Sequence, residues 1–154
     1  MPLALLLLVC VLPVAAAWGF YLHPELLPGK RANFGELIEP PRPLRDIRLL
    51  TAAGKDFRLE EVRGTWSLLW LASQPCNDEC ASPLRGMRNI RSALRENGAR
   101  LRSFAIPLTA PANELRDGFY LVDPFGNLVM RYEANADFKG ILRDLERLLK
   151  YSRR

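Results

Sequence analysis

Residues Trp66–Cys80 read WSLLWLASQPCNDEC, a run in which seven nearly all apolar positions are followed by two of the chain's three cysteines. The apolar part, 66–72, is typical of a central strand buried on both faces of a sheet. Cys76 and Cys80 come directly after it and are four positions apart. Such a pair has three ordinary uses, which are a structural disulfide, a redox couple or a metal clamp.

The segments around this run alternate between strand and helix patterns. Leu84, Met87, Arg91 and Leu94, with Ile90 beside them, recur at helical spacing and predict a helix at 81–97. Strands are predicted at 47–50, 57–59, 101–106, 119–122 and 128–132, with a hairpin turn at 123–127 and a last helix from about 136 to 150. This order predicts an α/β fold with one mixed sheet and helices on both faces.

The N-terminal residues 2–22, PLALLLLVCVLPVAAAWGFYL, contain no charged side chain. A run of this length can cross a bilayer as a helix, and Pro13 would kink that helix without preventing it. We therefore predict a transmembrane anchor at 1–22, in which Cys10 is a small apolar residue. The alternative is a signal peptide cleaved near Ala15–Ala17, but the apolar run continues past this site and no basic region precedes it.

Two further regions complete the predicted organisation. Residues 23–45 are expected to form a proline-rich tether, extended and stiff at Pro40–Pro43. The globular domain is predicted at 46–150, which is long enough for one core.

Composition excludes several classes of function. The formal net charge is +5, with basic residues scattered among acidic ones, which favours a solvated surface. No nucleic-acid-binding motif and no glycine-rich phosphate loop is visible. His23 is the only histidine, so no Ser–His–Asp set is expected.

The cysteine pair lies between the first buried strand and the next helix, where thioredoxin-like proteins keep their redox pair. Its CxxxC spacing, with Asp78 and Glu79 inside, resembles the Sco/SenC family of membrane-anchored cytochrome oxidase assembly proteins. The stretch 119–132, FYLVDPFGNLVMRY, resembles that family's hairpin. The likeness covers about residues 45–150. It implies a thioredoxin-like mixed sheet flanked by helices, preceded by one N-terminal transmembrane helix, and a role in assembling the copper centre of cytochrome c oxidase.

The chain departs from the family pattern in its ligands. Sco/SenC proteins have a copper-ligand histidine upstream of the hairpin, where this chain has Asn113–Gly118. The family's proline after the second cysteine is replaced by Ala81, and thioredoxin's proline before the hairpin strand is replaced by Gly118. The resemblance therefore implies a relative that lacks the copper-ligand histidine.

Helical phase predicts different roles for the two cysteines. Cys76 falls at the helix start, where unpaired N–H groups and the helix dipole stabilise a thiolate. Cys80 is in phase with the apolar stripe and is expected to point toward the core. We predict that Cys76 is the attacking thiol and Cys80 the resolving thiol of a disulfide exchange. Asp78 and Glu79 would oppose the thiolate charge.

Other uses of the pair remain open. Two thiolates can hold Cu(I), so Cys76 and Cys80 are also candidate metal ligands, whereas zinc lacks four nearby ligands. A disulfide between them would close a small loop and stabilise the fold little. An oxidising compartment is expected, and the resemblance implies the bacterial inner membrane with the domain in the periplasm, although Lys30 and Arg31 favour the opposite topology. The implied partners are the membrane and a respiratory oxidase subunit or another copper or disulfide protein.

Ordinary structural roles are expected for the remaining polar and aromatic candidates. Trp66 and Trp70 are expected to pack in the core, with shielding of Cys76 by an indole as the alternative. Residues 123–126 are expected to form a turn and not a ligand set. Glu60, Glu61 and Arg63 are expected on a solvated face.

Overall fold

The computed structural model describes residues 2–23, 33–51, 53–73, 81–108 and 115–152. The chain divides into two compact units, Met1–Ala32 and Asn33–Arg154. In the described part of the first unit, residues 2–22 form the helix α1 (Pro2–Leu22). Among the described residues, no helix is both long and apolar enough to cross a membrane.

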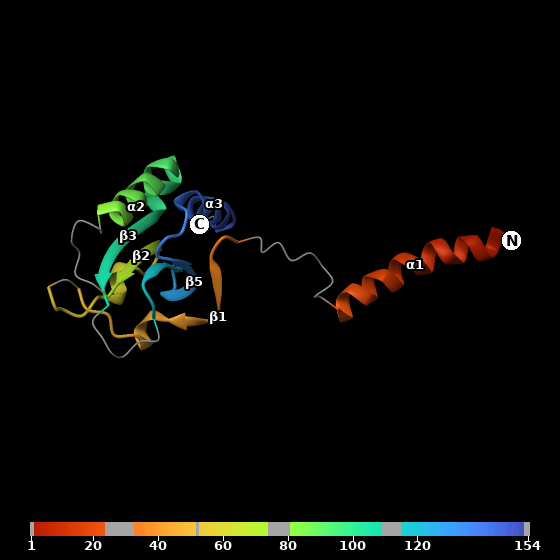
Figure 1. The fold of residues 1–154 in the computed structure, drawn as a ribbon, viewed down its shortest axis with the longest axis horizontal. Helices are drawn as coiled ribbons and strands as arrows, with labels where there is room; N and C mark the ends of the chain where they lie inside the picture. Colours follow the sequence, from red (N-terminus) through yellow and green to blue (C-terminus); the bar gives the residue numbers. More distant parts are fainter. Residues whose placement is uncertain (1, 24–32, 52, 74–80, 109–114, 153–154) are drawn as a thin grey trace. The chain divides into compact units, whose positions relative to one another are not determined.

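The second unit is built on a five-stranded mixed sheet (Figure 1). Its strands are β1 (Glu36–Pro43), β2 (Trp66–Ala72), β3 (Leu101–Pro107), β4 (Gly118–Val122) and β5 (Asn127–Glu133), in the spatial order β1-β5-β4-β2-β3. β2 is parallel to β3 and antiparallel to β4, and the remaining pairs are antiparallel. Five of the seven β2 residues are buried because the strand is paired on both sides and covered on both faces. The predicted central strand is confirmed at its predicted limits.

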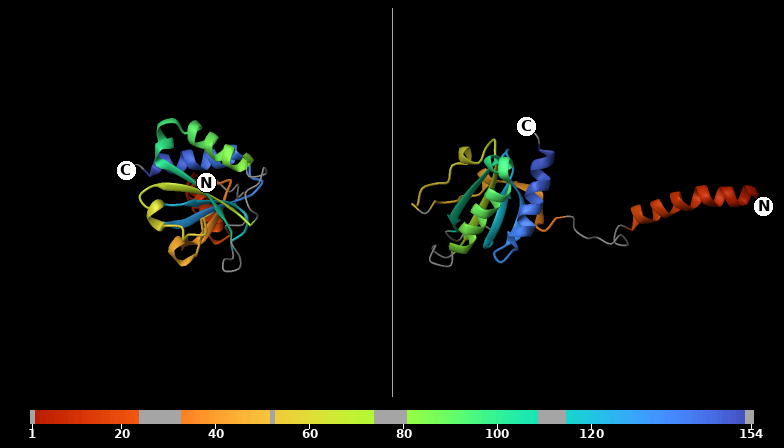
Figure 2. Two further views of the ribbon diagram at one scale, coloured as in Figure 1. Left: turned by 90° about the vertical axis from the view of Figure 1, so that its left-hand side faces the viewer. Right: turned by 90° about the horizontal axis from the view of Figure 1, so that it is seen from above.

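Two α-helices cover one face of this sheet, α2 (Ala81–Ala93) and α3 (Phe138–Tyr151), and they lie side by side (Figure 2). Asp137 begins α3 by accepting a hydrogen bond from the Lys139 backbone at 3.0 Å. The core under the helices is made of buried side chains from the sheet and from both helices, including Leu68, Phe119, Met130, Met87, Ile90, Ile141, Leu145 and Leu149.

The other face of the sheet is covered by the segment 44–62. This segment contains two single-turn 3-10 helices, η2 (Leu44–Asp46) and η3 (Leu59–Glu61). Its buried side chains pack on the sheet in a second cluster that includes Leu44, Ile47, Leu49, Val62, Leu69 and Tyr120. The predicted mixed sheet flanked by helices is confirmed, but both described α-helices of this unit lie on one face. On the opposite face, the segment 44–62 takes the place of a helix, because it supplies enough apolar side chains to cover the sheet.

The sequence predicts Arg91 in the apolar stripe of α2, and this prediction is wrong. Its side chain is exposed, and its Nε donates a hydrogen bond to the Gly98 carbonyl at 3.2 Å. The buried large apolar side chains here are Met87 and Ile90 of α2 and Leu94, which follows its end. The helix also ends at Ala93, and the chain continues as the 3-10 helix η5 (Arg95–Arg100). Spacing alone could not separate Arg91 from its apolar neighbours, because its angular position lies at the border of the stripe.

The proline-rich tether predicted at 23–45 overlaps the structured unit. β1 lies inside this range and pairs with β5, with Glu36 opposite Arg131 and Pro43 opposite Asn127. The compact unit therefore begins at about Asn33. Prolines weaken a central strand because they lack an N–H donor, but an edge strand tolerates them on its unpaired side.

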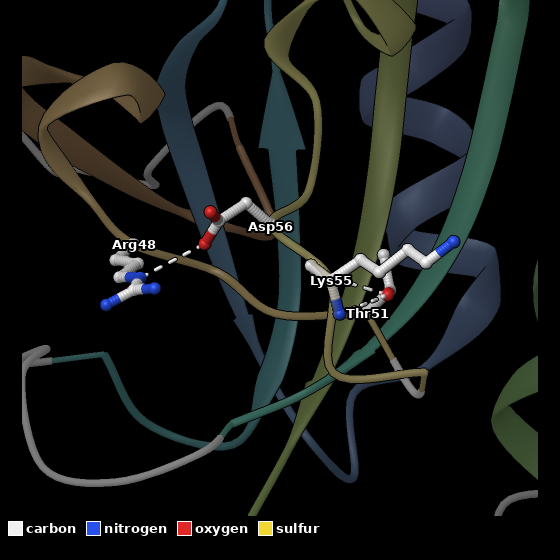
Figure 3. Close-up of polar contacts among 4 residues, drawn as sticks. All are labelled: Arg48, Thr51, Lys55 and Asp56. Carbon is white, nitrogen blue, oxygen red and sulfur yellow. Dashed lines mark hydrogen bonds and ion pairs between the residues drawn. The ribbon is translucent and has the colours of Figure 1, made fainter.

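The strands predicted at 47–50 and 57–59 are reduced to one bridge between Leu50 and Asp56. The turn between them is held by the Thr51 hydroxyl, which donates to the Lys55 carbonyl at 3.1 Å, and by an ion pair of 3.0 Å between Arg48 and Asp56 (Figure 3). The apolar side chains of this segment pack in the second core cluster. The two predicted strands therefore do not pair along their whole length.

Candidate functional site

The predicted redox pair, Cys76 and Cys80, lies in the segment 74–80, outside the residues that the structure describes. Both neighbours of this segment are described. β2 ends at Ala72, Ser73 follows it, and α2 begins at Ala81. The buried strand before the pair and the helix after it are thus confirmed. The orientation of the two thiols and a bond between them stay predictions.

Ser73 is held at the end of β2 by Asp117, which comes just before β4. The Ser73 backbone N–H donates to Asp117 Oδ1 at 3.0 Å, and the Ser73 hydroxyl donates to the same oxygen. β2 and β4 are antiparallel neighbours with Leu71 opposite Gly118, so the end of one strand meets the start of the other. The Asp117 carboxylate therefore fixes the residue from which the cysteine segment departs.

Tyr120 fixes the backbone that carries Asp117. It is buried in β4, with 1% of its surface exposed. Its hydroxyl accepts from the Arg116 N–H at 3.1 Å and donates to the Arg116 carbonyl at 3.0 Å. A chain of contacts thus runs from the core through Arg116 and Asp117 to Ser73. These hydrogen bonds order the exposed end of β2, because they replace contacts with water by contacts within the protein.

Sequence reasoning assigned no role to Asp117 or Tyr120. Asp117 lies just before the stretch 119–132 that resembles the Sco/SenC hairpin, and Tyr120 lies within it. That stretch was interpreted from its apolar and aromatic residues as a strand and a turn. The signal that was present is an aspartate directly before a glycine at the start of a buried strand. A carboxylate in that place is within reach of the backbone N–H groups at the neighbouring strand end.

Gly118 permits the close approach of β4 and β5 at this edge of the sheet. Its φ is +150°, and a Cβ there would overlap the Tyr132 carbonyl oxygen. Only glycine accepts this conformation and this contact without strain. Gly118 stands at the position where thioredoxin has a proline. In this chain the close approach of β4 and β5 requires a glycine there.

A shallow recess of about 380 Å³ lies beside the start of α2. It is lined by Trp70, Ser82, Pro83, Phe138 and residues 134–136. Trp70 is 7% exposed and its ring lies 4.5 Å from that of Phe119, which in turn makes an edge contact with Phe138 at 5.4 Å. Among the described residues, the Trp70 indole N–H has no hydrogen-bond partner.

The two tryptophans of β2 are packing residues, as predicted. Trp70 belongs to the cluster under the helices, and Trp66 is partly buried against the same cluster. The Trp66 indole N–H donates to the Ser152 hydroxyl at 2.9 Å. Shielding of Cys76 by an indole stays a prediction, because Cys76 is outside the described residues.

The other predicted polar positions have structural roles. Asp123 closes the β4–β5 turn by accepting hydrogen bonds from the backbones of Phe125 and Asn127, at 2.9 and 2.8 Å. Glu60, Glu61 and Arg63 are exposed. These findings confirm a turn and a solvated face.

Metal ligands do not gather in the part of the chain that the structure describes. Within it, no three His, Cys, Asp or Glu side chains lie close enough to hold an ion. His23 follows α1 in the N-terminal unit, and Cys10 lies within that helix as a free cysteine. The candidate Cu(I) ligands Cys76 and Cys80 stay predictions.

A buried carboxylate that sequence reasoning did not find lies on α3. Asp144 is 2% exposed, and its Oδ2 accepts from the backbones of Phe34 and Gly35 at 2.8 and 3.0 Å and from the Tyr132 hydroxyl at 3.2 Å. Burial, the Asp144 charge and this hydrogen bond raise the pKa of Tyr132 above its ordinary value. The signal in the sequence was an aspartate among the apolar positions of the last helix.

The comparison with protein families gives one match. Residues 108–152 match the family described as "Transmembrane-like, thioredoxin-like, C-terminal domain". No curated protein matches the chain in sequence.

Solved structures give broader matches. The solution structure of apo Sco1 from Thermus thermophilus is 15% identical, with 78% of this chain and 99% of that chain covered and a TM-score of 0.54. The crystal structure of Trgpx in apo form is 12% identical, with 68% and 94% covered and a TM-score of 0.50. Yeast Sco1 with copper bound is 16% identical, with 79% and 91% covered and a TM-score of 0.48. The family match and the first two structures show a thioredoxin-like fold, and Sco1 proteins are among the structural neighbours, as the resemblance in sequence implies.

Proposed function

We propose that this chain is a membrane-anchored thioredoxin-like protein that assists assembly of the copper centre of cytochrome c oxidase by thiol–disulfide exchange at Cys76 and Cys80. One observation carries the proposal. The cysteine segment 74–80 joins the buried central strand β2 to α2 in a thioredoxin-like fold, and its first neighbour, Ser73, is held by Asp117. The role in oxidase assembly comes from the Sco/SenC resemblance of the sequence.

The proposed exchange reduces a disulfide of the partner in two steps. The Cys76 thiolate attacks one sulfur of that disulfide, forms a mixed disulfide and releases the other sulfur as a thiolate, which takes up a proton. The Cys80 thiolate then attacks the Cys76 sulfur and releases the second partner thiol. The partner gains two electrons, and this chain is left with a Cys76–Cys80 disulfide.

The order of residues and elements supports an attacking thiolate at Cys76. Cys76 comes one helical turn before Cys80, and α2 follows from Ala81; the unpaired N–H groups at a helix start lower the pKa of a thiol. The core of the domain keeps the strand before the segment rigid, because β2 is paired on both sides. A rigid support holds a reacting group in place better than a loop alone.

Trapping of the mixed disulfide tests the exchange. Cys80→Ser is expected to accumulate a covalent complex with a partner disulfide protein, because the resolving thiol is absent. Cys76→Ser is expected to accumulate none. The two variants differ from the native chain by one atom each, and complexes are detected by non-reducing electrophoresis and mass spectrometry. Trapping by Cys76→Ser in place of Cys80→Ser would reverse the assigned roles, and trapping by neither would contradict thiol exchange.

Handling of Cu(I) as cargo is the second candidate function. Two soft thiolates bind Cu(I) at low coordination number, and Sco/SenC resemblance favours the same metal. We expect an anaerobic titration of the reduced full chain to show one Cu(I) bound per chain. The double variant Cys76→Ser/Cys80→Ser serves as the control and is expected to bind none. Equal binding by both would contradict this candidate.

A scaffold with a structural disulfide is the remaining alternative. It predicts a pair with a very low reduction potential that cycles with no reductant or partner.

The membrane anchor and the periplasmic location are also part of the proposed function. They rest on the uncharged residues 2–22 and on the oxidising compartment that a disulfide needs. Fractionation of cells and protease protection of the C-terminal unit test them.

A further inference from the structure

The positive charge of this chain is concentrated in its helices. The elements α2, η5 and α3 together carry nine basic and three acidic residues. The remaining sequence carries 13 basic and 14 acidic residues, which nearly cancel. The net charge of +5 is therefore carried mainly by the elements α2, η5 and α3, of which α2 and α3 cover one face of the sheet. This location differs from the scattered charge that the sequence suggests.

Four basic residues of α2 and η5 are exposed, Arg85, Arg88, Arg91 and Arg95, whereas Arg100 is half-buried and donates to the Leu149 carbonyl. α2 contains Arg85, Arg88 and Arg91 and no acidic residue, and η5 adds Arg95 next to Glu96. Within the described residues, Arg85, Arg88 and Arg95 form no ion pair or hydrogen bond. A row of uncompensated guanidinium groups raises the local potential and attracts anions.

α3 presents a second row of basic side chains. Lys139, Arg143, Arg147 and Lys150 are exposed and follow one another at spacings of four, four and three. They lie on the helix face opposite the buried residues of the core. Arg143 also stacks over the Phe34 ring at 5.4 Å. The helices α2 and α3 lie side by side on the sheet (Figure 2). Their exposed basic residues, with the neighbouring Arg95, are here named the basic helix layer: Arg85, Arg88, Arg91, Arg95, Lys139, Arg143, Arg147 and Lys150.

We propose that the basic helix layer docks the domain on an anionic phospholipid surface. The charges are spread along two helices of 13 and 14 residues, each about 20 Å long. A broad surface of this kind matches a layer of phosphate groups better than a single small anion. Seven of the nine basic residues are arginines, whose planar groups bind phosphate in a bidentate manner.

The choice of lipid over an acidic protein rests on one part of the proposed function, the membrane anchor. An anchored domain meets the bilayer at high effective concentration, so weak charge contacts are sufficient to hold it there. Each basic residue close to an anionic membrane strengthens such contact by roughly fivefold. Docking of the helix layer would leave the opposite face, covered by 44–62, directed away from the lipid.

Arginine footprinting of the full chain tests this proposal. The chain is reconstituted in vesicles of phosphatidylcholine alone or with added phosphatidylglycerol, and modification by phenylglyoxal is read by mass spectrometry. Arg85, Arg88, Arg95 and Arg143 are expected to be modified several-fold more slowly in the anionic vesicles, and high salt is expected to remove the difference. Arg45, Arg58 and Arg63, which are exposed in or next to the segment on the opposite face, are expected to react equally in both. Equal rates for the helix layer would overturn the proposal.

A charge-neutral variant and an acidic polymer complete the test. Arg85→Gln/Arg88→Gln/Arg95→Gln is expected to remove the protection of Arg143, whereas Arg45→Gln/Arg58→Gln/Arg63→Gln is expected to keep it. Poly-L-glutamate is added to the phosphatidylcholine vesicles in a parallel sample. Protection by the polymer alone, without protection by phosphatidylglycerol, would assign the surface to an acidic protein and reject the lipid. Disulfide trapping by Cys80→Ser on the same vesicles separates a failure of docking from a failure of thiol exchange.

Discussion

Asp144 and Tyr132 form a polar centre inside the core of the domain. Asp144 accepts three hydrogen bonds, two of them from the backbone at the start of the structured unit. The Tyr132 hydroxyl lies 2.9 Å from the Met130 sulfur as well. All three donors bind Oδ2, and Oδ1 has no hydrogen-bond partner among the described residues, so the loss of any one donor would leave this buried carboxylate still less satisfied. The centre ties residues at both ends of the unit to β5 of the sheet.

The free energy of unfolding is expected to fall as the pH rises above about 10, the pKa of an exposed tyrosine. The pKa of Tyr132 is raised in the folded protein, so the unfolded chain loses this proton first and is favoured at high pH. Tyr132→Phe is expected to reduce that fall and to lower stability at neutral pH by about 1–3 kcal/mol. Urea denaturation between neutral and alkaline pH measures both effects. Tyr151→Phe, at an exposed position, is the control, and an equal change of slope in the two variants would contradict the explanation.

At the scale of elements, two connections meet at the end of the sheet. The segment that follows β2 carries the cysteines, and the residues before β4 carry Asp117. The Tyr120 hydroxyl holds the Arg116 backbone in the residues before β4, and the neighbouring Asp117 binds Ser73 at the end of β2. The position of Ser73, the last described residue before the cysteine segment, is therefore set by a strand that is distant in sequence.

Asp117→Ala is expected to raise the rate at which the reduced cysteine pair is alkylated at neutral pH by several-fold. The substitution releases Ser73 and removes a negative charge near the segment, and both changes favour an accessible thiolate. Asp56→Ala is the matched control, because Asp56 is an exposed carboxylate paired with Arg48 in a turn away from this connection. Timed alkylation with mass spectrometry measures the rate. Identical rates in the two variants would show that Asp117 does not influence the pair.

At the scale of the whole molecule, β1 is part of the domain. It covers the free edge of β5, and residues 34 and 35 before it are bound to Asp144. A chain that begins at Asn33 is therefore expected to unfold cooperatively. A chain that begins at Asp46, the boundary predicted from the sequence, is expected to lose several kcal/mol of stability or to aggregate, because the β5 edge and Asp144 lose their partners. Thermal unfolding and sedimentation of the two chains measure this, and equal stability would contradict the role of β1.

The sequence allowed most of the second unit to be predicted, and the failures share a physical cause. Trp66–Ala72 and the apolar stripe of the last helix are strongly patterned, and both elements appear where they were expected. β1 was missed because three prolines suggest a tether, and only pairing with β5 makes it a strand. Asp117, Tyr120 and Asp144 were missed because their partners are far away in sequence. The mixed α/β sheet followed from local pattern and its thioredoxin-like character from the family resemblance, whereas the contacts around Ser73 and Asp144 follow from tertiary structure.

The prolines of β1 have a consequence for how the domain behaves among its neighbours. Pro40, Pro41 and Pro43 lie on the outermost strand of the sheet, and none of them has an N–H group to offer. A second chain therefore finds a poor template for extending the sheet at this margin. The three prolines that made β1 look like a tether in the sequence therefore also protect this edge of the sheet against edge-to-edge aggregation.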